Sequence, residues 1–96
     1  MAKLIITLDG KNQSEYELNS ETTTIGRHKN NDIQSDNLSV SGHHSKIIKI
    51  AGDFFIEDMG SSNGTFVNSN LIKKYALKDG DEIKIGKHHL RYVKEV

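Results

Sequence analysis

Hydrophobic and polar residues alternate in short runs along most of the chain, the pattern of half-buried β-strands. The runs rich in Ile, Val, Thr, Phe and Tyr cover residues 4–8, 15–18, 22–25, 47–50, 54–58, 65–67, 83–85 and 90–93. Glycine and other turn formers separate neighbouring runs, which predicts hairpins across 9–12, 51–53 and 86–88. Many short strands with turns at this spacing predict an all-β fold, a sandwich or a barrel.

One stretch, 71–78, has a helical look, but no N-cap residue opens it and Asp79-Gly80-Asp81 follows directly. We therefore predict a short strand, a bend and a short extended piece there. The polar segment 28–39 is predicted to be a loop, and loops on a β scaffold are where binding residues concentrate.

The pair Asn63-Gly64 lies between two predicted strands, 54–58 and 65–67. Asn-Gly is favoured in two-residue hairpin turns because both central residues need positive φ. The sequence thus predicts a tight hairpin there. Such a turn would hold the Asn63 amide and the Ser61 and Ser62 hydroxyls at the rim of the sheet.

Length and composition predict a single domain spanning residues 1–96. The absence of cysteine excludes disulfides and thiolate chemistry. The chain contains no apolar run long enough to span a bilayer, and its first residues are too short a run for a signal peptide, so we expect a cytoplasmic domain. The 13 basic residues balance the 13 acidic ones, which argues against nucleic-acid or membrane partners.

Enzymatic chemistry has little support in the sequence. No Gly-x-Ser-x-Gly elbow supplies a nucleophile, and no glycine-rich loop precedes a helix to hold a nucleotide. The nearest hint is Ser41, which lies close in sequence to His43 and His44. We expect no catalytic residues and no cofactor.

The adjacent histidine pairs His43-His44 and His88-His89 raise a second alternative, a metal site. Neighbours in a strand point to opposite faces, so at most one histidine of each pair could reach a shared ion. Acidic ligands at a useful spacing are not evident, and we expect no metal.

A site for a phosphorylated peptide is the stronger hypothesis from the residues. Arg27, one of only two arginines, offers a planar fork of donors that suits a phosphate. Ser41 and Ser62 offer hydroxyl donors, and Asn63 offers an amide that can bond a peptide main chain. Three loops at one end of a sandwich would have to bring these side chains together.

The order of short motifs along the chain resembles the forkhead-associated (FHA) family. The motifs are Gly26-Arg27, Asn31-Asp32-Ile33, Ser41-x-x-His44, Asp58-x-Gly60-Ser61-Ser62-Asn63-Gly64-Thr65-Phe66-Val67-Asn68 and Leu77-x-x-Gly80-Asp81-x-Ile83-x-Ile85-Gly86. The resemblance implies a β-sandwich of about eleven strands in two antiparallel or mixed sheets. It also implies a non-enzymatic module in signal transduction that binds phosphothreonine in a partner protein, such as a Ser/Thr kinase or its substrate.

The resemblance also implies roles for single residues. Arg27, Ser41 and Ser62 would hold the phosphate, and Asn63 would bond the peptide backbone. The remaining positions, Gly26, His44 and Gly64, would support the site structurally.

One position departs from the family, because Gly42 stands where Arg, Lys or Asn is usual. Two interpretations follow: weaker phosphate binding, with Lys29, Lys46 or His43 as compensating groups, or a degenerate domain that acts in phosphate-independent protein interaction or self-association.

Overall fold

The computed structural model describes residues 2–8 and 10–94. Within these residues the chain forms eleven strands and no helix. The strands are β1 (Ala2–Leu8), β2 (Lys11–Glu17), β3 (Thr22–Gly26), β4 (Ile33–Gln34), β5 (Ser45–Ile50), β6 (Asp53–Asp58), β7 (Thr65–Val67), β8 (Asn70–Ile72), β9 (Lys74–Ala76), β10 (Glu82–Ile85) and β11 (His88–Lys94).

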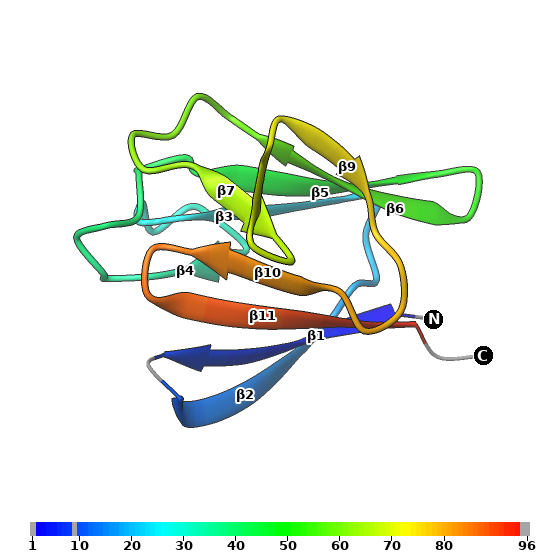
Figure 1. Cartoon of the computed structure of the whole chain (residues 1–96), viewed down its shortest axis with the longest axis horizontal. Helices are drawn as coiled ribbons and strands as arrows, with labels where there is room; N and C mark the ends of the chain where they lie inside the picture. Colours follow the sequence, from blue (N-terminus) through cyan, green and yellow to red (C-terminus); the bar gives the residue numbers. More distant parts are fainter. Residues whose placement is uncertain (1, 9, 95–96) are drawn as a thin grey trace.

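The strands form two sheets that pack face to face (Figure 1). The six-stranded sheet has the order β2-β1-β11-β10-β7-β8 and is antiparallel throughout, and the five-stranded sheet has the order β4-β3-β5-β6-β9. The second sheet is mixed, because β4 pairs with β3 in parallel. The predicted all-β sandwich of two antiparallel or mixed sheets is confirmed.

Alternation along the strands builds the core between the sheets. Leu4, Ile83 and Leu90 point inward from the six-stranded sheet, and Ile47 and Ile56 point inward from the other; each is at most 1% exposed. A side chain of this type gains about 1.5–3 kcal/mol from full burial. The described residues therefore share one hydrophobic core, which fixes the two sheets and the loops at their ends.

Local turn chemistry explains the hairpin between β5 and β6. Ala51 and Gly52 both have positive φ, 51° and 87°, the combination that a type I′ turn needs. The predicted hairpins between β1 and β2 and between β10 and β11 are also present.

The predicted hairpin at Asn63-Gly64 is wrong. The strands on either side, β6 and β7, lie in different sheets, and of these two residues only Gly64 has positive φ, 88°. The segment 59–64 is a crossing between the sheets. The chain instead reverses after β7 at Asn68 and Ser69, whose φ angles are 49° and 70°.

The stretch 71–78 behaves as predicted. It continues β8 to Ile72, bends at Lys73 and enters β9 at Lys74. Because β8 is at the edge of one sheet and β9 at the edge of the other, this bend carries the chain back between the sheets.

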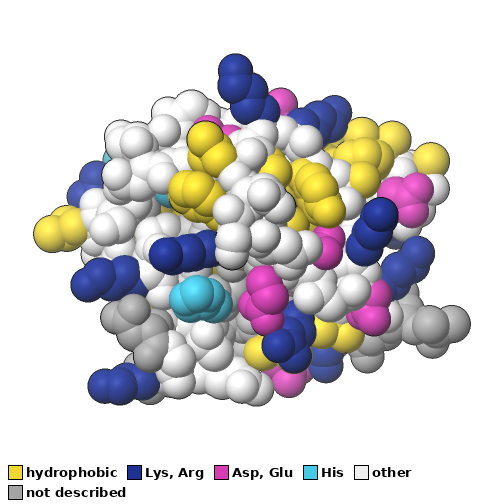
Figure 2. Space-filling model, viewed as in Figure 1, with side chains coloured by type: hydrophobic (Ala, Val, Ile, Leu, Met, Phe, Trp, Pro, Cys, Tyr) yellow, Lys and Arg dark blue, Asp and Glu magenta, His cyan; other side chains and the backbone are white. Residues whose placement is uncertain are grey.

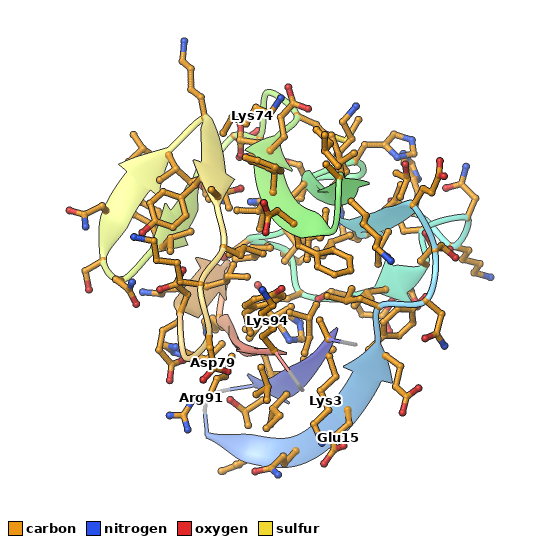
Figure 3. The ribbon with its side chains drawn as sticks, turned by 90° about the vertical axis from the view of Figure 1, so that its right-hand side faces the viewer. Lys3, Glu15, Lys74, Asp79, Arg91 and Lys94 are labelled. Carbon is orange, nitrogen blue, oxygen red and sulfur yellow. The ribbon has the colours of Figure 1, made fainter. Side chains whose placement is uncertain are left out.

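The two ends of the sandwich differ in content. At one end β1 and β11 lie side by side, with Ala2 opposite Lys94, and Figure 3 looks onto this end. There Lys3 and Glu15 point toward each other in a 3.1 Å ion pair, and Asp79 accepts the backbone N–H of Lys94. The connections β3–β4, β4–β5 and β6–β7 lie at the other end, on the left of Figure 1.

Candidate functional site

Three connections meet at the left-hand end of the sandwich and enclose a hollow of about 220 Å³. All four residues predicted to touch a phosphopeptide line it. The complete lining is Arg27, Leu38, Ser39, Val40, Ser41, Gly42, Ser62 and Asn63. The structure therefore brings together side chains that lie up to 36 residues apart in sequence (63 − 27).

The backbone on either side of Arg27 is held against the β4–β5 connection. The N–H of Arg27 donates to the carbonyl of Ser41 at 2.9 Å, and the N–H of His28 donates to the carbonyl of Gly42 at 3.1 Å. These bonds continue the antiparallel pairing of β3 and β5 beyond the sheet. They fix the position from which the exposed Arg27 side chain extends into the hollow.

Gly26 makes this close approach of the two segments feasible. A Cβ there would overlap the carbonyl oxygen of Gly42 and lie 2.7 Å from Nδ2 of Asn31. Asn31 is buried and bridges the same segments, donating to the carbonyls of His28 and Gly42 at 2.8 Å each. A side chain at position 26 would force the loops apart.

Ser41 and Ser62 lie next to each other. The backbone N–H of Ser62 donates to the hydroxyl oxygen of Ser41 at 3.0 Å. The hydroxyl proton of Ser41 is not used in that bond, so it can be donated to an acceptor in the hollow.

The His44 side chain links the β4–β5 and β6–β7 connections. The side chain is fully buried, and its Nδ1 accepts the backbone N–H of Ser41 at 3.0 Å. A ring nitrogen that accepts carries no hydrogen, so the proton of the neutral ring is on Nε2, which donates to the carbonyl of Gly64 at 2.9 Å. Both ring nitrogens are therefore occupied by backbone partners.

The same contacts argue against hydrolase chemistry at Ser41. The His44 ring meets the backbone N–H of Ser41 instead of its hydroxyl. A serine nucleophile needs a base within hydrogen-bond reach of the hydroxyl, and His44 does not provide one.

Asn63 is fixed to the neighbouring loop. Its Nδ2 donates to the carbonyl of Ser39 at 2.9 Å. Gly64 follows with a φ of 88°, and a Cβ there would lie 2.6 Å from Cδ1 of Leu71. Glycine thus allows both the turn and the close packing of the β6–β7 connection against β8.

Asp58 organises the segment 59–65, and sequence reasoning assigned it no role. Its Oδ2 accepts the backbone N–H groups of Gly60 and Ser61 at 3.0 Å each, and its Oδ1 accepts the hydroxyls of Ser61 and Thr65 at 2.5 and 2.7 Å. Burial alone would raise the pKa of the Asp58 carboxyl, but these hydrogen bonds outweigh it and hold the pKa below its ordinary value.

A chain of hydroxyls extends this network into the core. Because Thr65 donates its proton to Asp58, the buried 2.7 Å contact between Ser45 and Thr65 is donated by Ser45. The contact joins β5 of one sheet to β7 of the other. The order Asp-x-Gly-Ser, an aspartate followed by turn residues, is the sequence signal that could have identified Asp58 as a loop anchor.

The space above Gly42 is filled by the His28 ring. A Cβ at position 42 would lie 2.6 Å from both Cδ2 and Nε2 of His28. The His43 ring lies beside it, with centroids 5.0 Å apart. None of the predicted compensating groups, Lys29, Lys46 and His43, lines the hollow, and Lys46 pairs with Glu57 at 3.6 Å.

The histidine pairs do not converge on an ion. In the part of the chain that the structure describes, no group of three or more His, Asp or Glu side chains could hold a metal. His88 Nε2 contacts the hydroxyl of Ser35 at 2.5 Å, whereas His89 lies opposite Lys84 on the other face of the sheet.

Comparison with known proteins decides the family. The chain matches the FHA domain over residues 23–86, two thirds of its length. It belongs to the FHA family. It is 37% identical to the glycogen accumulation regulator GarA of Mycolicibacterium smegmatis over 91 residues, 94% of this chain and 58% of the relative. It is also 37% identical to the oxoglutarate dehydrogenase inhibitor of Corynebacterium diphtheriae, over 96% of this chain and 65% of the relative.

A solved structure shares the fold. Mycobacterium tuberculosis EmbR in complex with a low-affinity phosphopeptide is 35% identical with a TM-score of 0.87, covering 96% of this chain and 24% of EmbR. The chain spans less than two thirds of the length of each of the two curated relatives, GarA and the oxoglutarate dehydrogenase inhibitor. Within its described residues, no helix is long and apolar enough to cross a membrane.

Proposed function

We propose that this FHA domain binds phosphothreonine in a partner protein at the hollow between its three loops. The observation that carries the proposal is the convergence of Arg27, Ser41, Ser62 and Asn63 on one hollow. Each side chain offers donors or acceptors that a phosphorylated, extended peptide can use.

The division of labour follows from the hydrogen bonds already made. The guanidinium of Arg27 supplies charged, paired donors to the phosphate, and the hydroxyl proton of Ser41 supplies a third. Ser62 adds its hydroxyl at the same rim. The amide of Asn63, held by Ser39 through Nδ2, presents its oxygen to a peptide N–H.

Gly26, His44 and Gly64 support the site without touching the peptide. Gly26 permits the approach of the two loops, and His44 links the backbone of Ser41 to that of Gly64. Hydrogen bonds cost least to form on binding when their donors are already positioned, so these contacts raise affinity.

The surroundings of Gly42 favour phosphate binding over a degenerate domain. Glycine there removes a side-chain donor, but the His28 imidazole occupies that space next to Arg27. Nitrogen donors therefore remain next to Arg27. We assign the domain no catalytic activity and place it in the cytoplasm. A Ser/Thr kinase that uses ATP would phosphorylate its partner there.

Titration of a phosphothreonine peptide library tests the proposal. Wild-type protein should select phosphorylated peptides at micromolar affinity or weaker, roughly −8 kcal/mol or less in magnitude. Arg27→Ala should lose about 2–5 kcal/mol, because it leaves the phosphate without its paired donors. Arg27→Lys should lose part of that, since it keeps the charge and removes the fork. A library without phosphate-dependent binders, or equal binding by Arg27→Ala, would overturn the proposal.

A further inference from the structure

A second hollow adjoins the proposed phosphate site and shares Arg27 with it. Its lining consists of Arg27, His28, Lys29, Asn30 and His43. Every member carries nitrogen donors or can gain them by protonation, and no member carries a carboxylate. The chain as a whole is electrically balanced, so this gathering of basic groups is local.

The nearest acidic side chains in sequence are engaged elsewhere. Asp32 accepts the backbone N–H and approaches the hydroxyl of Thr24, at 2.9 and 3.3 Å. Asp36 accepts an amide N–H of Gln34 at 2.7 Å. Among the described residues, Figure 2 shows Lys and Arg side chains but no Asp or Glu at the left-hand end of one face.

Backbone bonds hold His28 in this hollow: its N–H donates to the carbonyl of Gly42, and Asn31 donates to the carbonyls of His28 and Gly42. The His43 ring lies beside the His28 ring, with centroids 5.0 Å apart. Gly42 completes the arrangement, because a side chain there would collide with the His28 ring. Glycine at position 42 thus leaves room for the His28 imidazole at the boundary between the two hollows.

We propose that this second hollow binds another anionic group of the same peptide, a second phosphate or an acidic side chain. The inference rests on the proposed phosphothreonine site, since Arg27 belongs to both hollows. Lys29 supplies a full positive charge, and His28 and His43 supply imidazole donors. An extended peptide advances about 3.3 Å per residue, so the second anion lies one to three positions from the phosphothreonine.

The test uses a degenerate peptide library with one fixed phosphothreonine, divided into three pools. One pool has no further acidic group, one has a glutamate at each position within three of the phosphothreonine in turn, and one has a second phosphothreonine there instead. Affinities are measured by calorimetry for wild type, Lys29→Gln, His43→Ala and the control Lys78→Gln. Lys78 lies in the β9–β10 connection, at the opposite end of the sandwich (Figure 1).

The second phosphate should tighten binding by about tenfold at one or two positions, the gain of a charge-assisted contact, and glutamate by less. Lys29→Gln and His43→Ala should each reduce that gain and leave the singly phosphorylated pool unchanged within about twofold, as exposed charges do when they are not in contact. Lys78→Gln should keep the full gain.

No gain at any position, or the same gain in both variants as in wild type, would overturn the second site while leaving the first intact. A gain from the second phosphate but none from glutamate would assign the hollow to phosphate. Failure of the singly phosphorylated pool to bind, or binding that survives Arg27→Ala, would instead overturn the underlying phosphothreonine site, and the second site with it.

Discussion

The backbone N–H of Ser62 donates to the hydroxyl oxygen of Ser41 at 3.0 Å, so the β4–β5 and β6–β7 connections meet at one side chain. The bond turns the serine oxygen into an acceptor and leaves its proton for a ligand. Under the proposed function Ser41 has two roles: it fixes the adjacent loop, and it would donate to a bound phosphate.

Ser41→Ala should weaken phosphopeptide binding by about 1.5–3 kcal/mol, the usual contribution of a hydrogen bond to a charged group. The variant also leaves the N–H of Ser62 without its acceptor, so the free energy of unfolding should fall slightly. Calorimetric titration with a phosphothreonine peptide measures the first effect and thermal unfolding the second. Ser20→Ala, an exposed serine between β2 and β3, should change neither. Undiminished binding by Ser41→Ala would remove Ser41 from the site.

His44→Ala should lower both stability and binding, because it removes two hydrogen bonds and leaves a cavity between two loops. The expected cost in unfolding free energy is about 2–4 kcal/mol. His44→Asn provides a sharper comparison, since an asparagine oxygen can take the place of Nδ1 and accept the N–H of Ser41 while the link to Gly64 is lost. Its stability should fall between those of the other two proteins. Unchanged stability in His44→Ala would contradict the supporting role of the ring.

Asp58→Asn should destabilise the protein by about 1–3 kcal/mol at neutral pH, because a neutral amide replaces a carboxylate that accepts four hydrogen bonds. The folded-state pKa of Asp58 lies below its ordinary value, so its stabilising contribution is complete above about pH 4 and lost as pH falls through the folded pKa.

Denaturant unfolding at a series of pH values measures this effect. The difference between wild type and Asp58→Asn should be largest near neutral pH and shrink below about pH 4. Asp36→Asn, which alters an exposed carboxylate bonded to Gln34, is the control and should show little change at any pH. A difference that stays constant down to pH 2 would show that the charge of Asp58 is not what holds the segment.

Asn63→Ala should weaken peptide binding by more than about tenfold and cost at most about 1 kcal/mol of stability, since the residue is exposed and makes one bond to Ser39. Asn63→Asp should weaken phosphopeptide binding further, because it loses the donor to Ser39 and adds a negative charge next to the phosphate. If Asn63→Asp bound a phosphorylated peptide as tightly as wild type, the amide could not lie beside the phosphothreonine.

Elements set by local chemistry were predictable from the sequence. Alternation gave the strands, and the turn at Ala51-Gly52 follows from the glycine between two β-branched or aromatic runs. The bend at Lys73 was also foreseen, because no cap supported a helix there.

The turn at Asn63-Gly64 was misinterpreted because the preference for positive φ is local, whereas the choice of partner strand is not. Gly64 does adopt positive φ, yet β6 pairs with β5 and β9, and β7 pairs with β10 and β8. The true reversal after β7 uses Asn68-Ser69, a pair without the glycine that would have signalled it.

The grouping of Arg27, Ser41, Ser62 and Asn63 was anticipated through the order of the motifs. The position of the His28 ring over Gly42 was not anticipated. It depends on backbone bonds between two segments that are separate in the sequence. Asp58 was overlooked for a similar reason: its four bonds depend on how the crossing between sheets curls around it.

The pairing of Ala2 with Lys94 has a practical consequence for the whole molecule. Both strands leave the sandwich at the end remote from the three loops (Figure 1). A polypeptide joined before β1 or after β11 starts out facing away from the hollow. The domain can accordingly be tethered to a surface or fused to a reporter through either strand while its binding end stays open to solution.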